Sequence, residues 1–172
     1  MQKHALTLAT ALLGVGMIAA CGGSKSTAPN KITYTATLSG ANERPSPVTS
    51  NGTGTWTGVL DPQTNTMTYT LTFSGLSANS NLAHIHAQSD ANNTANVVLN
   101  FATFAGSTTA FAPGSTSGTA AGVVNMSGGT VTGFSITGDS LRKAMDAGMA
   151  YVNVHTTAHG GGEIRGQIAR QQ

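Results

Sequence analysis

The sequence predicts an all-β domain, a Greek-key β-sandwich or barrel of about eight to nine antiparallel strands with one short helix. Three observations support this fold class. Apolar residues recur at every second position over much of the chain, and threonine, which favours strands, fills many of the positions between them. Glycine, serine and asparagine separate these alternating segments at short intervals. Only 8% of the residues are charged, so threonine, serine and asparagine must supply most of the polar surface.

The first strands show the clearest alternation. From Ile32 to Leu38 every second residue is apolar and the residues between are threonines, which predicts a strand with one buried face. The segments Thr53–Leu60 and Met67–Phe73 repeat this pattern, and the turn residues 61–65 between them predict a hairpin. The remaining strand candidates are Leu82–His86, Val97–Phe101, Gly118–Val124, Val131–Ile136, Tyr151–His155 and Glu163–Ile168.

One segment has the spacing of a helix. Asp139–Ala147 carries Leu141 and Met145 four residues apart, begins with an acidic residue and is followed by Gly148. These features predict a two-turn helix that closes one end of the domain. The segment 102–118, rich in small residues, predicts a loop or a weak edge strand. The lone Trp56 is expected in the core.

The N-terminal residues differ from the rest of the chain. Lys3 and His4 precede an apolar run that continues to Ala20, the pattern of a secretory signal peptide over residues 1–20. The residues before Cys21 resemble a bacterial lipobox, and Cys21 is the only cysteine in the chain. We therefore expect Cys21 to be lipidated and to anchor the mature protein to the membrane of the cell envelope. Gly22 after the cysteine favours the outer membrane in a Gram-negative cell.

The expected organisation has three parts: the signal peptide over 1–20, the lipidated cysteine and a flexible tether over 21–30, and one β domain over 31–172. Once Cys21 carries a lipid, no thiol remains for a disulfide or a thiolate metal ligand. The formal net charge is +2 and basic residues are not clustered, which excludes a nucleic-acid partner. The composition also excludes a coiled coil and an acidic disordered tail.

Histidines provide the first candidate site. His84 and His86 are two residues apart, so on a strand both project from one face, about 6.5 to 7 Å apart at the backbone. Tyr151, Asn153 and His155 share a face of their own predicted strand by the same rule. If the two strands are neighbours, three imidazoles can meet at one metal ion.

Such a group suits copper or zinc, with Glu43, His159 or Glu163 as candidates for a fourth ligand or for a residue that orients the ligands. The alternative is that the histidines only form hydrogen bonds in a polar seam between strands.

Glu163 and Arg165 provide the second candidate site. They lie two residues apart and are predicted to project from the face opposite Ile164. One interpretation makes Glu163 a general base and Arg165 an anion clamp. The favoured interpretation is a structural polar network that ties neighbouring strands and includes Asn153. No nucleophile elbow, phosphate-binding loop or zinc-protease helix motif is present, so no catalytic residue is assigned.

Four ordered motifs resemble the chordin-type (CHRD) domain, and the resemblance covers about Ile32 to Ile168. The matching segments are Ala41-Asn42-Glu43-Arg44-Pro45, Ala83-His84-Ile85-His86, Tyr151-Val152-Asn153-Val154-His155-Thr156 and Gly162-Glu163-Ile164-Arg165-Gly166-Gln167. The resemblance implies an extracytoplasmic β domain, found singly in many bacterial proteins and repeated in the animal growth-factor antagonist chordin. No enzymatic activity is established for the family.

The chain also shows a weaker resemblance to copper/zinc superoxide dismutase, in which a His-x-His strand and a later strand histidine hold the copper. His84, His86 and His155 follow that order, but no histidine lies between His86 and His155 to bridge a second metal.

Three functions therefore stay open. The first is a non-enzymatic binding or structural module at the cell envelope, with a protein or glycan partner. The second is a mononuclear copper- or zinc-binding protein, and the third is a dismutase-like enzyme.

Overall fold

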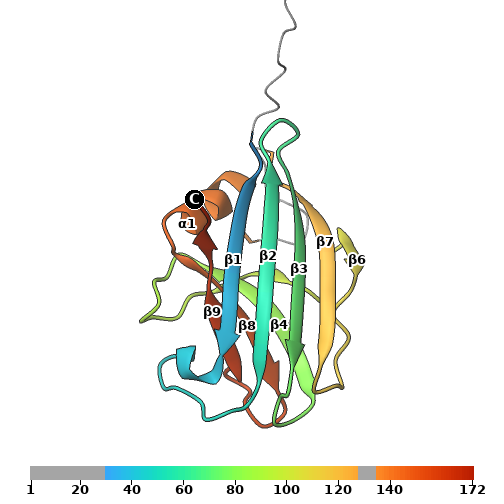
Figure 1. Ribbon diagram of the computed structural model, residues 1–172, viewed down its shortest axis with the longest axis vertical. Helices are drawn as coiled ribbons and strands as arrows, with labels where there is room; N and C mark the ends of the chain where they lie inside the picture. Colours follow the sequence, from blue (N-terminus) through green and yellow to red (C-terminus); the bar gives the residue numbers. More distant parts are fainter. Residues whose placement is uncertain (1–29, 128–134) are drawn as a thin grey trace, which may run out of the picture.

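A computed structural model describes residues 30–127 and 135–172 of the chain (Figure 1). This part contains one curled antiparallel sheet, a short 3-10 helix and one α-helix. The strands are β1 (Ile32–Ser39), β2 (Thr53–Asp61), β3 (Thr66–Ser74), β4 (Ser80–Ala87), β5 (Val97–Asn100), β6 (Ser107–Thr109), β7 (Gly118–Asn125), β8 (Ala150–Thr156), β9 (Ile164–Gln167) and β10 (Ala169–Arg170). The helices are η1 (Gly40–Asn42) and α1 (Gly138–Asp146).

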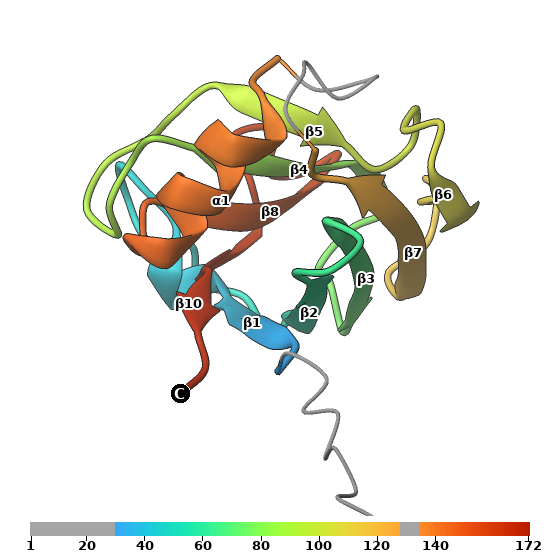
Figure 2. The ribbon, with the colours of Figure 1, turned by 90° about the horizontal axis from the view of Figure 1, so that it is seen from above.

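The strands follow one another across the sheet in the order β5-β4-β8-β9-β1-β2-β3-β7-β6, and β10 pairs with β1. The sheet curls so that the half containing β4 and β8 faces the half containing β2 and β3 (Figure 2). The apolar core lies between these halves, with α1 at one end. The predicted all-β architecture with one short helix is confirmed.

The alternation of threonine with apolar residues determines which face of each early strand is buried. In β3, Met67, Tyr69 and Leu71 are buried and the threonines between them are exposed. Trp56 in β2 is fully buried, as expected, and pairs with Leu71 of β3 across the hairpin. The turn of this hairpin ends at Asn65, whose φ of 51° lies in the left-handed region that asparagine tolerates.

In contrast, β8 is buried along its whole length. Val152 and Val154 belong to the apolar core, and Asn153 and His155 alternate with them on the opposite face. Loops cover this second face, since backbone carbonyls at Asp90, Ala95 and Gly160 accept hydrogen bonds from side chains on it. The loops create a second buried layer, and this layer is polar.

Helix α1 begins one residue before the predicted start. The Thr137 hydroxyl oxygen accepts a hydrogen bond from the backbone N–H of Ser140 and caps the helix. Leu141 and Met145 are fully buried in the core, and Gly148 adopts the positive φ expected after a helix C-terminus. No helix in the described ranges is long and apolar enough to cross a membrane.

Two predicted segments differ from the structure or fall outside it. Residues 131–134 of the expected strand Val131–Ile136 lie outside the described residues, and Ser135 and Ile136 form a bend. The expected loop or weak edge strand over 102–118 contains the three-residue edge strand β6.

Gly166 allows β9 to lie against β1 where the two halves of the sheet join. A Cβ atom at Gly166 would lie 2.6 Å from the backbone oxygen of Thr37, so the backbones would have to separate. We expect Gly166→Ala to lower the free energy of unfolding by about 2 kcal/mol, as overpacked sites do. Gly160→Ala is the matched control, because its Cβ would meet nothing within 4 Å. Equal urea midpoints for the two variants would contradict this account of the junction.

Candidate metal centre

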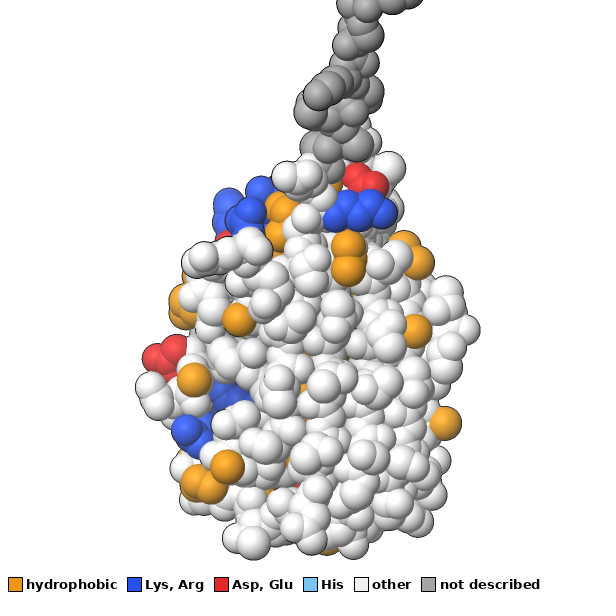
Figure 3. Space-filling view, in the orientation of Figure 1, with side chains coloured by type: hydrophobic (Ala, Val, Ile, Leu, Met, Phe, Trp, Pro, Cys, Tyr) orange, Lys and Arg blue, Asp and Glu red, His pale blue; other side chains and the backbone are white. Residues whose placement is uncertain are grey.

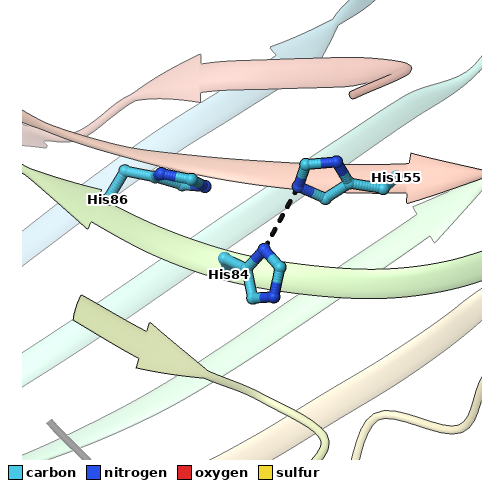
Figure 4. A group of neighbouring side chains, drawn as sticks. All are labelled: His84, His86 and His155. Carbon is cyan, nitrogen blue, oxygen red and sulfur yellow. Dashed lines mark hydrogen bonds between the residues drawn. The ribbon is translucent and has the colours of Figure 1, made fainter. Parts of the chain in front are cut away.

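Strands β4 and β8 bring the three histidines together. Their register places His84 opposite Asn153, His86 opposite Tyr151 and His155 opposite Leu82. Because β4 and β8 are neighbours, the histidine faces predicted separately for each strand are the same face of the sheet. One ligand atom from each of His84, His86 and His155 lies within 4.8 Å of the other two, and all three side chains are buried (Figure 4).

Backbone carbonyls determine which ring nitrogen of two histidines carries the proton. Nδ1 of His86 lies 2.8 Å from the carbonyl oxygen of Ala95, and Nδ1 of His155 lies 3.0 Å from that of Gly160. A carbonyl oxygen only accepts, so both Nδ1 atoms donate. In the neutral rings Nε2 then carries the lone pair, which is the arrangement found in metal-ligating histidines.

The third histidine joins this pair directly. Nδ1 of His84 lies 3.2 Å from Nε2 of His155, and Figure 4 shows both rings facing the end of the His86 ring. Two nitrogens bound to one tetrahedral ion at 2.0–2.1 Å are about 3.3 Å apart. His84 and His155 are therefore spaced as ligands of a single ion. The three ligand atoms lie within 4.8 Å of one another, so a closer approach of His86, by up to about 1.5 Å, would complete the set.

His86 has an unsatisfied lone pair at the centre of this group. Its Nε2 atom is buried and has no hydrogen-bond partner among the described residues. A buried acceptor without a partner costs about 1 to 3 kcal/mol, so natural proteins rarely keep one without a reason. A metal ion between the three rings would use this lone pair, and the residues present therefore fit such an ion.

All three imidazoles favour the neutral form, which is the form that binds metal. Burial, together with the neighbouring His155 and His86, lowers the pKa of His84 to about 4. Burial also lowers the pKa of His86 to about 4, against the opposing effect of its hydrogen bond to Ala95. The pKa of His155 is lowered by burial as well.

Tyr151 supports the centre from the side. Its ring stacks on the His86 ring at 4.6 Å with an interplanar angle of 3°, and its hydroxyl oxygen accepts a hydrogen bond from the backbone N–H of Ala95. Tyr151 thus holds both His86 and the carbonyl group that orients it. The sequence predicted that Tyr151 shares a strand face with His155, because the two are four residues apart. That spacing was the signal for a role in the site, but no role was predicted for Tyr151.

The candidates for a fourth ligand lie elsewhere. Glu43, His159 and Glu163 are not members of the group of mutually close ligand atoms. Glu163 is fully buried and its carboxylate accepts from the hydroxyls of Ser50, Ser77 and Thr156 and from the backbone N–H of Ser77. Both of its oxygens are therefore occupied by hydrogen bonds within the protein.

Glu163 and Arg165 also do not pair with each other. Arg165 donates to the backbone oxygen of Asp90 and to Oε1 of Gln167, and its guanidinium lies 3.6 Å from the centre of the Tyr151 ring. Glu163 precedes β9, and its partners include Ser50 before β2 and Thr156 at the end of β8. The two residues have different hydrogen-bond partners and stabilise separate parts of the polar layer.

Asn153 connects to Glu43. Its Nδ2 atom donates to Oε2 of Glu43 over 3.3 Å, and Oε1 of Glu43 is buried without a partner among the described residues. Burial raises the pKa of Glu43 to about 7, and the hydrogen bond from Asn153 and the charge of Arg165 oppose that rise.

The raised pKa of Glu43 predicts a loss of stability as pH rises. Between its ordinary pKa of 4.5 and about 7, the folded state keeps a proton that the unfolded state releases. The free energy of unfolding should therefore fall over this window, by on the order of 3 kcal/mol. Glu43→Gln should remove this fall in the free energy of unfolding. The variant should be about as stable as wild type at pH 5 and more stable than wild type at pH 8. Urea unfolding at both values checks this, and a variant less stable than wild type at pH 8 would refute it.

These observations define an all-β domain whose curled sheet carries an apolar core on one face and a buried polar layer with a histidine group on the other. Residues 34–168 match the family model described as the CHRD domain. The chain belongs to the CHRD domain family. A search of curated proteins found no match to this chain.

Proposed function

We propose that this protein is a non-enzymatic module of the cell envelope that binds one copper or zinc ion through His84, His86 and His155. The observation that carries the metal assignment is the buried, unpartnered Nε2 atom of His86, which faces two further imidazoles. Membership of the CHRD family supports a module rather than an enzyme, since the family brings no established activity.

The donor set explains the choice of metal. Neutral imidazoles bind zinc and copper well, whereas calcium and magnesium prefer oxygen ligands. To bind the ion through Nδ1, the neutral His84 ring would carry its proton on Nε2 in place of Nδ1. The carbonyls of Ala95 and Gly160 would keep the rings of His86 and His155 in the ligating orientation. Three protein ligands also leave a coordination position for water or a small ligand.

Elemental analysis tests this proposal. Protein purified without a histidine tag and incubated with copper or zinc, followed by removal of free ion, should retain about one ion per chain. The variant carrying His84→Ala and His86→Ala should retain none. Equal metal contents in wild type and variant would overturn the proposal, and so would a wild type that retains neither ion. Superoxide turnover by the copper-loaded protein would favour the dismutase-like enzyme over a binding module.

The envelope location rests on the N-terminal sequence. A short apolar run behind Lys3 and His4, and small residues directly before a single cysteine, together form the pattern of a lipoprotein signal. Several acyl chains on Cys21 would anchor the mature chain stably, and the residues up to Asn30 would serve as a tether.

Cys21→Ala should abolish lipid attachment. In bacteria fed a radiolabelled fatty acid, we expect label on the wild-type protein and none on the variant, and the variant should move from the membrane fraction to the soluble fraction. Labelling of both proteins, or of neither, would contradict lipidation at Cys21. Cys21 is the only thiol in the chain, so the variant changes no other cysteine chemistry.

A further inference from the structure

A polar pocket of about 280 Å³ lies beside β9 and η1, and none of the three histidines lines it. Its lining residues are Thr37, Asn42, Arg44, Ala91, Arg165 and Gln167. In Figure 3, basic atoms reach the surface on the side of the molecule where Figure 1 shows β9 and η1, with one acidic group near them at the edge of the view. The pocket combines two guanidinium groups with neutral hydrogen-bonding side chains, and no acidic side chain lines it.

Arg165 is the buried wall of this pocket. Its side chain is only 2% exposed, and both of its hydrogen bonds leave from Nη2, to Asp90 and Gln167. Its Nε and Nη1 atoms form no hydrogen bond within the described part of the chain. The ring of Tyr151 lies under the guanidinium and fixes its plane. Arg165 is therefore held in place, and its Nε and Nη1 donors are available to a ligand.

The charge of Arg165 has no direct counter-ion. Among the described residues the ion pairs are Arg142–Asp146 and Arg170–Asp146, and neither involves Arg165. The side chains of Glu43 and Asp90 act favourably on its charge without contacting it: Glu43 binds Asn153, and the Asp90 carboxylate accepts from Asn92 and Asn93. A buried cation without a paired anion is costly, and an anion in the pocket would remove much of that cost.

Arg44 provides a second cation at the rim. One of its terminal nitrogens, Nη1, donates to the backbone oxygens of Ala41 and Glu43, which holds the side chain over the pocket. The positive charge of Arg44 also acts unfavourably on Arg165. Two fixed cations on one pocket repel each other unless a negative group lies between them.

We propose that this pocket binds the carboxylate of a small organic acid or of an acidic sugar. Guanidinium groups with free, coplanar donors match the two oxygens of a carboxylate, and the amides of Asn42 and Gln167 can bind neighbouring hydroxyls. Pockets for drug-sized ligands start at about 300 Å³, so the ligand is small. The pocket shares no residue with the histidine group, although Tyr151 contacts both Arg165 and His86.

The test is an NMR titration of the ¹⁵N-labelled protein at low salt with D-glucuronate, malonate, D-glucose and inorganic phosphate. We expect saturable shifts of the backbone signals of Asn42, Arg44 and Ala91 with a carboxylate and none with glucose. Shifts with glucuronate alone identify an acidic sugar as the ligand, and shifts with malonate as well identify carboxylates in general. Either result supports the proposal that the pocket binds a carboxylate.

Arg44→Gln should weaken carboxylate binding by about tenfold, the loss expected for one charge-assisted hydrogen bond. Arg142→Gln is the matched control, because it removes the same charge from an exposed ion pair outside the pocket. Arg44 is on the rim and partly exposed, so this variant should fold even if a change at Arg165 does not. Equal affinities of the two variants, tighter binding of phosphate than of any carboxylate, or no saturable shift would each overturn the proposal.

Discussion

His86→Gln should weaken copper and zinc binding by at least about 100-fold, since loss of an outer-shell partner alone costs 10- to 100-fold in metal proteins. The substitution removes Nε2, the buried lone pair that has no partner among the described residues. It leaves two imidazoles, which cannot hold one ion as tightly as three. Competition with a chromogenic chelator at pH 7.5 measures the two affinities.

His159→Gln is the control for this experiment. His159 is the fourth histidine of the domain and lies outside the group of close ligand atoms. The affinity of the His159→Gln variant for either metal should equal that of wild type within about twofold, a difference of less than about 0.5 kcal/mol. A large loss in His159→Gln, or an unchanged affinity in His86→Gln, would mean that the ion binds somewhere else.

Glu163→Ala should cause the largest loss of stability, at least about 3 kcal/mol, because buried donors to a charged group are expensive to leave unpaired. The carboxylate of Glu163 accepts four hydrogen bonds, which connect the segment before β2, the segment after β3 and the end of β8. Without the carboxylate, Ser50, Ser77 and Thr156 lose their shared acceptor. Urea unfolding followed by Trp56 fluorescence measures the change.

An amide replacement separates the charge from the hydrogen bonds. Burial opposes ionisation of Glu163, but the donors from Ser50, Ser77 and Thr156 outweigh burial and lower its pKa. Its contribution is therefore present above the ordinary pKa of 4.5 and is lost as pH falls through the lowered value. Glu163→Gln should unfold with a weaker acid dependence than wild type.

The matched surface change is Asp146→Asn, which removes the charge from two partly exposed ion pairs and keeps an oxygen to accept from the Tyr34 hydroxyl. Such pairs contribute less than about 1 kcal/mol. If Asp146→Asn costs as much as Glu163→Ala, the carboxylate of Glu163 does not have the structural role assigned to it.

The strands that alternate threonine with apolar residues were predictable because one face of each is buried and the other meets water. The segments 32–38, 53–60 and 67–73 correspond to β1, β2 and β3 within one or two residues. Helix α1 was predictable from the spacing of Leu141 and Met145. Short elements such as β6, β10 and η1 have too few residues to establish a period, and pairing with neighbours rather than local sequence determines them.

The histidine group was predictable in part. The spacing of His84 and His86 indicated a shared strand face, but the pairing of β4 with β8 joins residues 71 positions apart, and no local pattern specifies it. The carbonyls of Ala95 and Gly160 that orient two rings belong to loops, where any residue supplies a carbonyl. Glu163 and Arg165 separated because β9 begins between them, at Ile164, so that they meet different neighbours.

The most direct test of the metal centre is a zinc titration of ¹⁵N-labelled protein, followed by long-range NMR spectra of the histidine rings. We expect one equivalent of zinc to shift Nδ1 of His84 and Nε2 of His86 and His155, with the His159 ring unchanged. The Nδ1 atoms of His86 and His155 should stay protonated, since each donates to a carbonyl oxygen. Ring signals of His84, His86 and His155 that stay unchanged at saturating zinc would contradict the central claim that these three residues form one metal site.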